Sequence, residues 1–335
     1  MKIIIRADGS NYRGMGHISK QVTLYKELSS IGHELLFVTK HNVSTLSILD
    51  INNVNYISFE GDKYFNIYEI IGTFIPDLII LDILDTSMQY IDNLKQNNVK
   101  IITFDNTDES SFMCDMIFNV MYYHNNNLKE KYKNFTVLHE GYKYIIMNSK
   151  YSVFSKEIGS EVKNILLTQG GSDTSEKTPF LLSILLNLGC KYNIEVVIGP
   201  AFSNNNIYEI EKIASENTNI NINYKPSSLF ELIKKSDLVV TAGGTTMWEI
   251  AALKIPMYVY VNEAFEDETA TIIKELGFAL YNGFNPSKND IIENLKNIVT
   301  NFEIREELHN NMKKYNISSG VSRIVNLIDE GNKNV

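Results

Sequence analysis

The chain has 335 residues, of which 44% are hydrophobic and 21% charged, a composition typical of globular proteins and a length sufficient for two domains. Its 31 basic and 40 acidic residues leave a formal net charge of −9. Nucleic acids and anionic membranes are bound by clustered Lys and Arg, so this balance argues against both as partners. The chain shows neither a signal-peptide pattern nor the roughly 20-residue apolar run of a spanning helix, so we expect a cytoplasmic protein without membrane insertion. Cys114 and Cys190 are distant in sequence, and we expect two reduced thiols.

In the first half of the chain, short β-rich runs alternate with runs of helical period. Strands are predicted at Lys2–Arg6, Glu34–Thr39, Val54–Ser58, Asp77–Leu81, Lys100–Phe104, Met116–Val120 and Tyr144–Met147. Helices are predicted at Ile18–Ile31, Val43–Asp50 and Met88–Gln96, and His124–Asn134 is interpreted as an exposed loop. This alternation predicts βαβ crossovers and a mostly parallel sheet.

The same pattern begins again in the second half. Strands are predicted at Asn164–Thr168, Ile194–Ile198, Ile220–Asn223, Leu238–Thr241, Met257–Val261 and Ala279–Tyr281. Helices are predicted near Thr178–Leu188, Tyr208–Glu216, Leu229–Ser236, Met247–Leu253, Thr269–Leu276 and Asp290–Asn297. We therefore expect an α/β protein of two Rossmann-like domains facing across a cleft, residues 1–155 and 156–335, the second ending in a C-terminal helix.

The first predicted strand runs into a glycine-bearing loop that contains Gly14 and Gly16 and ends at His17, where a helix begins. Helix N-termini favour anions, and a histidine beside an anion site can act as a base near neutral pH. A dinucleotide-cofactor site is rejected, because Ser19 replaces the third glycine and the second strand ends in Thr39-Lys40 without an acidic residue. A purely structural role for His17 at the helix start stays open.

Two glycine-bearing turns follow strands in the second half. Gly170-Gly171-Ser172-Asp173 lets backbone approach a ligand closely, although a plain strand-to-helix turn explains it equally. Gly243-Gly244-Thr245-Thr246 combines glycines and hydroxyls before a helix, a pattern that favours a diphosphate. Glu249 lies about one helical turn later, where its carboxylate could accept both ribose hydroxyls or could simply stabilise the helix N-terminus.

Acidic residues also follow predicted strands, at Asp82 with Asp85 and at Asp105 with Asp108. The carboxyl ends of parallel strands line the ligand crevice of an open α/β sheet, so these acids are candidate site neighbours, although loop acids and helix caps are as common. The sequence has no HExxH motif or Cys/His cluster, no G-x-S-x-G elbow and no G-x-x-x-x-G-K-[ST] loop. We therefore expect no protein-bound metal and no cofactor.

Together these motifs resemble the nucleotide-sugar hydrolases of pseudaminic acid biosynthesis and their spore-coat polysaccharide relatives. The matching segments keep family order over about residues 1–285: Arg6-Ala7-Asp8, Gly14-Met15-Gly16-His17, Asp82, Phe104-Asp105, Gly141 with Tyr144, Gly170-Gly171-Ser172-Asp173, Gly243-Gly244-Thr245 to Glu249, and Ala251-Ala252-Leu253-Lys254-Ile255-Pro256. The resemblance implies a GT-B fold, in which the muramyl-pathway N-acetylglucosaminyltransferase is a more distant cousin.

The resemblance also implies an activity: metal-independent hydrolysis of a UDP-linked diacetamido-trideoxy sugar to UDP and free sugar. His17 would be the general base and Asp8 would orient the base or the sugar. The implied nucleotide-binding residues are Gly171, Ser172, Gly243, Gly244, Thr245, Thr246 and, for the ribose, Glu249. The implied substrate-binding residues are Arg6, Gly14, Gly16, Asp82 and Asp267.

Three positions depart from the family pattern. Phe265-Glu266-Asp267-Glu268 stands where the family carries an acidic-Asn-Gln motif, Lys20 stands where it often has Arg, and Ile83-Leu84 stands where it often has Tyr. Two other functions are weighed against hydrolysis. One is glycosyl transfer from the same donor to another acceptor, and the other is binding of a nucleotide sugar without catalysis.

Overall fold

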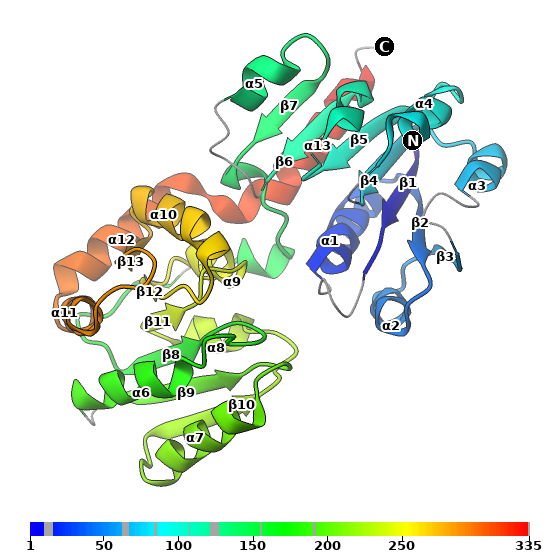
Figure 1. Ribbon diagram of the computed structural model, residues 1–335. Helices are drawn as coiled ribbons and strands as arrows, with labels where there is room; N and C mark the ends of the chain where they lie inside the picture. The colour runs from blue at the N-terminus through cyan, green and yellow to red at the C-terminus, as the bar shows by residue number, and fades with distance from the viewer. Residues whose placement is uncertain are drawn as a thin grey trace. The chain divides into compact units, whose positions relative to one another are not determined.

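The computed structural model describes residues 1–9, 16–61, 67–83, 86–106, 108–120, 127–154, 156–189 and 192–333. Its contacts divide the chain into a first unit, Met1–Asn148 with Ser318–Val335, and a second unit, Ser149–Ile317 (Figure 1). The expected division differs in two respects, since it falls after residue 155 and assigns the C-terminal helix to the second domain. That helix, α13 (Gly320–Lys333), instead contacts α1 of the first unit.

Within its described residues, the first unit forms one sheet of seven strands in the order β3-β2-β1-β4-β5-β6-β7. Every pair of neighbouring strands is parallel. In chain order the elements are β1 (Lys2–Ala7), α1 (Gly16–Ser30), β2 (Glu34–Lys40), α2 (Val43–Ile51), β3 (Tyr56–Phe59), α3 (Ile67–Phe74), β4 (Leu78–Asp82), α4 (Met88–Lys95), β5 (Lys100–Phe104), η1 (Glu109–Met113), β6 (Met116–Asn119), α5 (Asn127–Tyr132), β7 (Val137–Glu140) and η2 (Tyr142–Tyr144).

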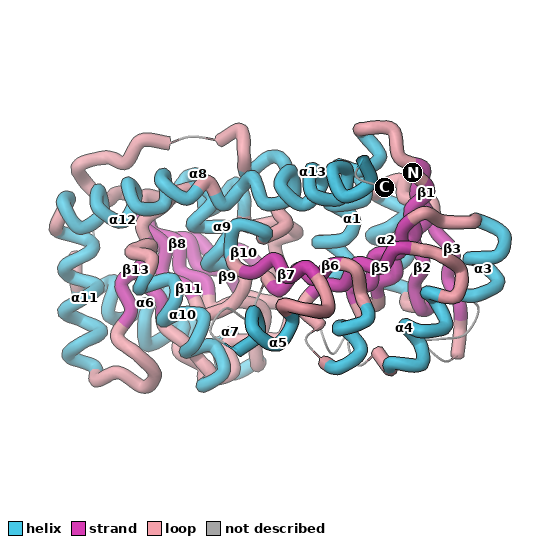
Figure 2. Tube along the Cα trace, turned by 90° about the horizontal axis from the view of Figure 1, so that it is seen from above, coloured by secondary structure: helices cyan, strands magenta, loops and turns pink. Residues whose placement is uncertain are grey.

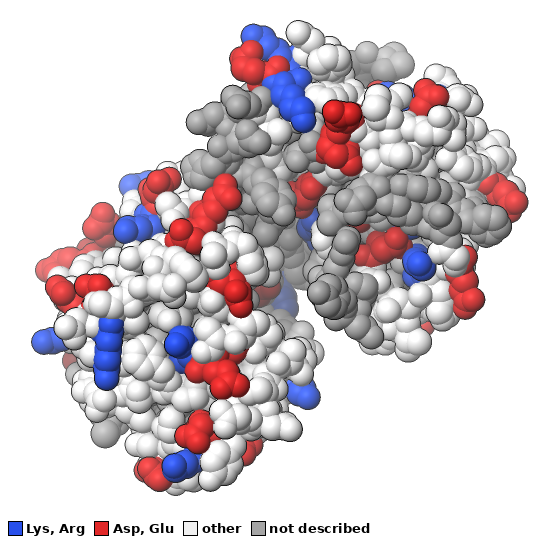
Figure 3. All heavy atoms as spheres, in the orientation of Figure 1, with Lys and Arg blue, Asp and Glu red and all other residues white. Residues whose placement is uncertain are grey.

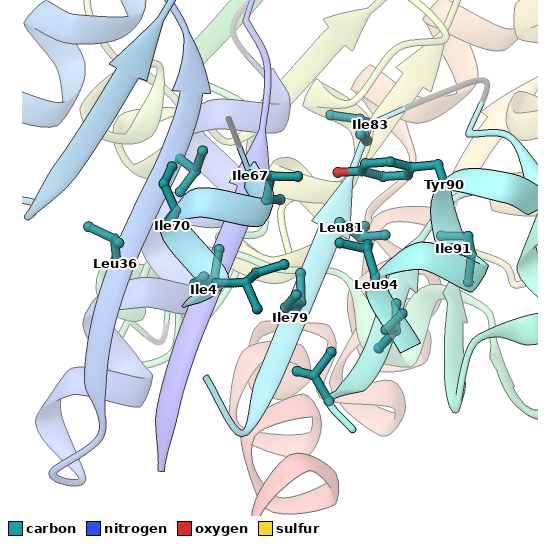
Figure 4. Close-up of a cluster of buried hydrophobic side chains, with 14 of the residues drawn as sticks. Ile4, Leu36, Ile67, Ile70, Ile79, Leu81, Ile83, Tyr90, Ile91 and Leu94 are labelled. Carbon is teal, nitrogen blue, oxygen red and sulfur yellow. The ribbon is translucent and has the colours of Figure 1, made fainter. Parts of the chain in front are cut away.

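The core of the first unit follows from apolar strands and amphipathic helices. The central strands are apolar on both faces, as expected of parallel strands that helices cover on both sides. On one face, α3 and α4 place apolar residues three and four positions apart and pack them against alternate strand residues. Figure 4 shows Ile4, Ile79 and Leu81 from the strands meeting this layer of helical side chains.

The last helix completes the other face of the first unit. Figure 2 shows α1 and α13 on one side of the strands and α4 on the opposite side. A Cβ atom at Gly320, the first residue of α13, would lie 2.0 Å from the carbonyl oxygen of Ile145. Only glycine therefore allows α13 to begin this close to the chain that follows β7.

Two predictions in the first half are wrong, and one strand is missed. Tyr144–Met147 is buried and apolar but is not a strand, because this segment packs as irregular chain beside the start of α13. The seventh strand is Val137–Glu140. The predicted loop His124–Asn134 contains α5, whose Leu128 and Tyr132 pack against Ile117; its residues 124–126 lie outside the described part.

The second unit repeats the architecture with six described strands, all parallel, in the order β10-β9-β8-β11-β12-β13. In chain order the elements are η3 (Ser149–Tyr151), β8 (Asn164–Thr168), α6 (Thr178–Asn187), β9 (Asn193–Ile198), α7 (Asn204–Ser215), β10 (Ile220–Tyr224), α8 (Phe230–Lys235), β11 (Leu238–Thr241), α9 (Thr246–Leu253), β12 (Met257–Val259), η4 (Ala264–Glu266), α10 (Asp267–Glu275), β13 (Ala279–Tyr281), α11 (Lys288–Thr300), α12 (Phe302–Tyr315) and η5 (Ile317–Ser319). All six predicted strands of this half are confirmed.

The surface charges and the helix lengths agree with the expectations drawn from the net charge and the hydrophobic runs of the sequence. On the face drawn in Figure 3, the described Lys and Arg side chains are scattered among Asp and Glu rather than gathered in one area. Among the described residues, every helix is too short or too polar to cross a membrane.

Candidate active site

The order of the first sheet points to a candidate ligand-binding edge beside β1. The chain continues to β2 on one side of β1, whereas β4 lies on the other side, so the order reverses between β1 and β4. In open α/β sheets ligands bind outside the carboxyl ends of the strands at such a switch point. Asp8 directly follows β1 and Asp82 ends β4, and Ala7 and Asp82 are paired in the sheet register.

His17 lies in the first turn of α1, and its ring is held by Asp82. The distance from His17 Nδ1 to Asp82 Oδ1 is 2.7 Å. The Asp82 side chain is 1% exposed, whereas the His17 side chain is 32% exposed. With its Nδ1–H donated to the carboxylate, the imidazole presents Nε2 as a proton acceptor, the arrangement of a histidine base with an orienting acid.

Two further residues of α1 reach the same carboxylate. Gln21 Nε2 donates to Asp82 Oδ2 at 2.8 Å, and Lys20 Nζ lies 3.4 Å from the same oxygen. Lys20 Nζ also donates to Asp105 Oδ2 at 3.0 Å. Positions 17, 20 and 21 share one face of a helix, which explains why all three side chains meet the edge of the sheet.

The electrostatics of these groups is dominated by mutual pairing. Burial by itself would raise the pKa of Asp82, but the Lys20 ammonium and the hydrogen bonds from His17 and Gln21 hold that pKa below its ordinary value. Burial likewise opposes the charged form of Lys20, and the carboxylates of Asp82 and Asp105 outweigh it and raise the pKa of Lys20. Asp82 and Lys20 therefore stay charged over the physiological range.

Arg6 and Asp8 form a separate pair at the end of β1. The Arg6 side chain is fully buried, and its guanidinium donates to both carboxylate oxygens of Asp8, at 2.8 Å for Nη2 to Oδ2. The guanidinium also lies over the Phe59 ring, and the backbone N–H of Lys40 donates to Asp8. The sequence predicts that Asp82 binds substrate and that Asp8 orients the base or the sugar. In the structure Asp82 orients His17, whereas Asp8 is held by Arg6.

The second unit holds a pocket of about 350 Å³ at the corresponding edge of its own sheet, where the order reverses between β8 and β11. The loops after β8, β11 and β12 line it: Gln169, Gly170, Gly171, Ser172, Thr174, Thr241, Ala242, Gly244, Thr245, Thr246, Asn262, Glu263, Phe265 and Glu266. Gly243 lies behind this lining, where a Cβ atom would come within 2.6 Å of Glu266 Cβ. Five of the predicted nucleotide-binding residues are therefore brought together here.

Polar groups in this pocket are available to a ligand. Thr245, the N-cap of α9, makes no side-chain capping hydrogen bond, and in the first turn of the helix the N–H groups of Met247 and Trp248 donate to the carbonyls of Gly244 and Thr245. Thr241 lines the pocket, and its hydroxyl is buried and has no hydrogen-bond partner among the described residues. Buried hydroxyls are normally satisfied, so an unpaired one in a pocket wall indicates a place for a ligand atom or a water.

Glu249 and Asp267 lie outside the lining of this pocket, and each accepts a hydrogen bond from a tyrosine. Tyr151 of η3 donates to Glu249 at 2.6 Å, and Tyr281 donates to Asp267 at 2.5 Å. Burial raises the pKa of Glu249, although the Tyr151 hydrogen bond and the Lys150 charge oppose the rise. Sequence reasoning had no signal for Tyr151, because the contact joins residues 98 positions apart.

Glu266 is turned toward backbone rather than toward a ligand. Its carboxylate accepts from the N–H groups of Asn262 at 2.7 Å and Glu263 at 3.3 Å, as part of a capping box at η4. Burial raises the pKa of Glu266 despite these hydrogen bonds. This carboxylate of the pocket lining is thus engaged by backbone donors.

The remaining predicted residues are only partly described. Gly16 is the first residue of α1, whereas Gly14 lies outside the described residues. Sequence reasoning named Asp105 only as a candidate site neighbour and did not include Lys20 or Gln21 among the site residues. The spacing of Lys20 and Gln21 from His17, three and four positions along one helix, was an available signal. Among the described residues, no group of three or more His, Cys, Asp or Glu side chains could hold a metal ion.

No family model matches the chain, but proteins of similar sequence are known. An uncharacterized protein of Methanocaldococcus jannaschii is 33% identical over 276 residues. The match covers 78% of this chain but only 56% of that protein's length. The UDP-2,4-diacetamido-2,4,6-trideoxy-beta-L-altropyranose hydrolase of Campylobacter jejuni is 23% identical over 283 residues, 83% of this chain and 98% of that protein. A spore coat polysaccharide biosynthesis protein of Bacillus subtilis is 22% identical over 342 residues, 98% of each.

Solved structures share the fold over nearly the whole chain. The UDP-GlcNAc 2-epimerase of Neisseria meningitidis bound to UDP-GlcNAc has a TM-score of 0.70 at 13% identity and covers 98% of this chain and 100% of its own. MurG of Acinetobacter baumannii and the glycotransferase of kitacinnamycin each have a TM-score of 0.65 at 11% identity over 98% of this chain, and cover 98% and 99% of their own chains. The chain therefore has the GT-B fold and is a distant homologue of the pseudaminic-type UDP-sugar hydrolase and of the spore coat polysaccharide biosynthesis protein.

Proposed function

We propose that the chain is a nucleotide-sugar hydrolase that releases UDP and a free diacetamido-trideoxy hexose, as a step of pseudaminic-type nonulosonic acid biosynthesis. The observation that carries the proposal is the hydrogen bond between His17 and Asp82, which leaves a partly exposed imidazole nitrogen at the ligand-binding edge of the first sheet. The Campylobacter relative, whose name states this activity, supports the choice of substrate.

In the proposed reaction a water oxygen forms a bond to the anomeric carbon, and the bond from that carbon to the diphosphate oxygen breaks. The electron pair leaves with UDP, and Nε2 of His17 takes the proton from water. The Asp82 carboxylate stabilises the resulting imidazolium. The N-terminus of α9 and the neighbouring glycine turns favour the negative charge of the departing diphosphate.

The other site residues keep their expected roles within this proposal. Gly171, Ser172 and the run Gly243-Gly244-Thr245-Thr246 bind the nucleotide, and Glu249 binds the ribose. Arg6, Gly14, Gly16 and Asp267 contact or shape the substrate site, whereas Asp82 orients the base. Asp8, which is held by Arg6, would contact the sugar, since the base is oriented by Asp82.

The test is incubation of the protein with UDP-2,4-diacetamido-2,4,6-trideoxy-hexose, and separately with UDP-GlcNAc, without an acceptor. We expect UDP and free sugar in equal amounts, and in ¹⁸O-water we expect the label in the sugar. His17→Asn should lower turnover by about 10²–10⁴-fold while UDP still binds. Lys95→Met, which changes a half-buried lysine of α4 that pairs with Asp115, is the matched control. Near-normal turnover of His17→Asn, or label in UDP, would contradict the mechanism.

The same fold in the kitacinnamycin glycotransferase favours glycosyl transfer as the second candidate. A transferase would release UDP only after an acceptor is added, so the acceptor-free incubation separates the two functions. Intact nucleotide sugar after long incubation with and without acceptors, despite measurable binding, would instead indicate a binding protein without catalysis.

A further inference from the structure

Four ionisable side chains form one connected cluster at the carboxyl edge of the first sheet. His17 Nδ1 lies 2.7 Å from Asp82 Oδ1, and Lys20 Nζ lies 3.4 Å from Asp82 Oδ2. Lys20 Nζ also lies 3.0 Å from Asp105 Oδ2. Lys20 therefore bridges two carboxylates, and Asp105 is coupled to His17 through Lys20 and Asp82.

The position of Asp105 is closely determined. Its backbone φ is 49°, in the left-handed region that non-glycine residues seldom occupy. Its Oδ1 accepts from the backbone N–H of Val120 at 2.6 Å, while Oδ2 accepts from Lys20. Both oxygens of this nearly buried carboxylate are thus engaged, and its backbone conformation is one that the surrounding structure must maintain.

The charge count of the cluster depends on the protonation of His17. With a neutral imidazole, one ammonium and two carboxylates leave a net charge of −1, and protonation of His17 brings the cluster to zero. The side chains of Lys20, Asp82 and Asp105 are only 17%, 1% and 6% exposed, so these charges are weakly screened by solvent. Without Asp105 the same cluster would be neutral before proton uptake and cationic after it.

Neighbouring elements carry further charged and polar groups among the residues that the structure describes. After β1, the guanidinium of Arg6 is paired with the carboxylate of Asp8. On α1, Gln21 contributes a neutral donor to Asp82. At the far strands, Asn119 of β6 donates to Glu140 of β7 at 3.5 Å, beyond Asp105. Among the described residues, Lys20 and Asp105 are the charged groups joined by ion pairs to the pair formed by His17 and Asp82.

We propose that Lys20 and Asp105 are positioning residues that set the proton affinity of His17 through Asp82, with opposite signs. Asp105 supplies the negative charge that favours proton uptake by the imidazole, and Lys20 limits that uptake and holds the two carboxylates together. The inference rests on the proposed role of His17 as the base, and it adds two residues that do not touch the substrate.

The experiment is an NMR titration of the His17 ring in the full-length protein, assigned by the signal lost in His17→Asn. Asp105→Asn removes one negative charge, so the midpoint pH of the titration should fall by about one unit. Lys20→Met removes the positive charge, so the midpoint should rise by about the same amount. The double variant has the native net charge of −1, and its midpoint should return toward the native one. Lys95→Met removes a half-buried ammonium of α4 that is paired with Asp115, and it should leave the midpoint unchanged.

Opposite shifts in the two single variants, with cancellation in the double variant, would support the proposal. Shifts in the same direction, or none, in folded variants would overturn it, because a purely structural role predicts no dependence on the sign of the charge. If Lys20→Met does not fold, Lys20→Arg, which keeps the charge, must keep the midpoint while Asp105→Asn lowers it. A native protein that hydrolyses no nucleotide sugar would refute the proposed function, and the ring titration would still decide this inference.

Discussion

Replacing Asp82 by asparagine removes the charge that joins three side chains of α1 to the first sheet. The native carboxylate is almost fully buried and accepts from His17 at 2.7 Å and from Gln21 at 2.8 Å, with Lys20 at 3.4 Å. The amide retains one acceptor oxygen and turns an NH₂ group toward the other donors. Loss of one partner of a buried ion pair costs about 3–5 kcal/mol, and we expect Asp82→Asn to lower the free energy of unfolding by about 3 kcal/mol near pH 7.

The pH dependence of this loss has a definite sign. The pKa of Asp82 in the folded protein is held below its ordinary value, mainly because Lys20 outweighs the effect of burial. A depressed carboxyl pKa stabilises the protein above the unfolded value of about 3.9 and ceases to do so as the pH falls through the folded value. The difference between native protein and variant should therefore be large at pH 5 and should shrink below pH 4.

Urea unfolding of both proteins between pH 3 and pH 7 measures this difference. Asp92→Asn, at an exposed position of α4, is the control and should change stability by less than about 0.5 kcal/mol. A variant within 1 kcal/mol of the native protein at pH 7, or an equal difference at pH 3 and pH 5, would refute the reasoning. If the hydrolase proposal holds, the folded variant should also lose about 10²–10⁴-fold in turnover.

Two further predictions concern the last helix and the pocket of the second unit. Gly320→Ala places a methyl group against the carbonyl of Ile145 and should lower the free energy of unfolding by about 1–3 kcal/mol, whereas Gly72→Ala in α3, which meets no atom within 4 Å, should be neutral or stabilising in the same urea titration. Thr241→Val removes an unpaired buried hydroxyl from the pocket wall, so the protein should stay folded while calorimetry shows UDP binding weakened by about tenfold. Thr168→Val, also buried but outside the lining, should leave binding unchanged, and equal losses in both variants would contradict a ligand contact at Thr241.

Local pattern was sufficient to predict most of the strands and the class of fold. Runs such as Ile165-Leu166-Leu167 and Val239-Val240 are apolar on both faces, which parallel strands covered on both sides require. The turn Gly243-Gly244-Thr245 was recognisable because it joins such a strand to a helix. His17 and Asp82 were both named from the sequence, each from the residues around it.

Their partnership could only come from the tertiary structure. His17 and Asp82 are 65 positions apart, and Lys20 and Asp105 are 85 apart. β4 pairs with β1 and β5 pairs with β4, so the ends of these strands lie at one edge of the sheet. That order is set by contacts between segments distant in sequence rather than by local propensity. Tertiary structure also decides that Asp82 rather than Asp8 orients the histidine, because Asp8 is already hydrogen-bonded to Arg6 at the end of β1.

The wrong prediction at Tyr144–Met147 likewise separates what local sequence determines from what tertiary contacts determine. Tyr144–Met147 is as apolar as a buried strand, and burial is what its composition determined. Its irregular course was decided by α13, a helix that begins more than 170 positions later and reaches the carbonyl of Ile145 through Gly320. The sequence by itself therefore determined which segments are buried, where glycine-bearing turns join strands to helices and that a histidine lies at the start of a helix. Which carboxylate holds that histidine, and which charges surround it, was decided by the strand order, because only the folded sheet brings these distant groups together.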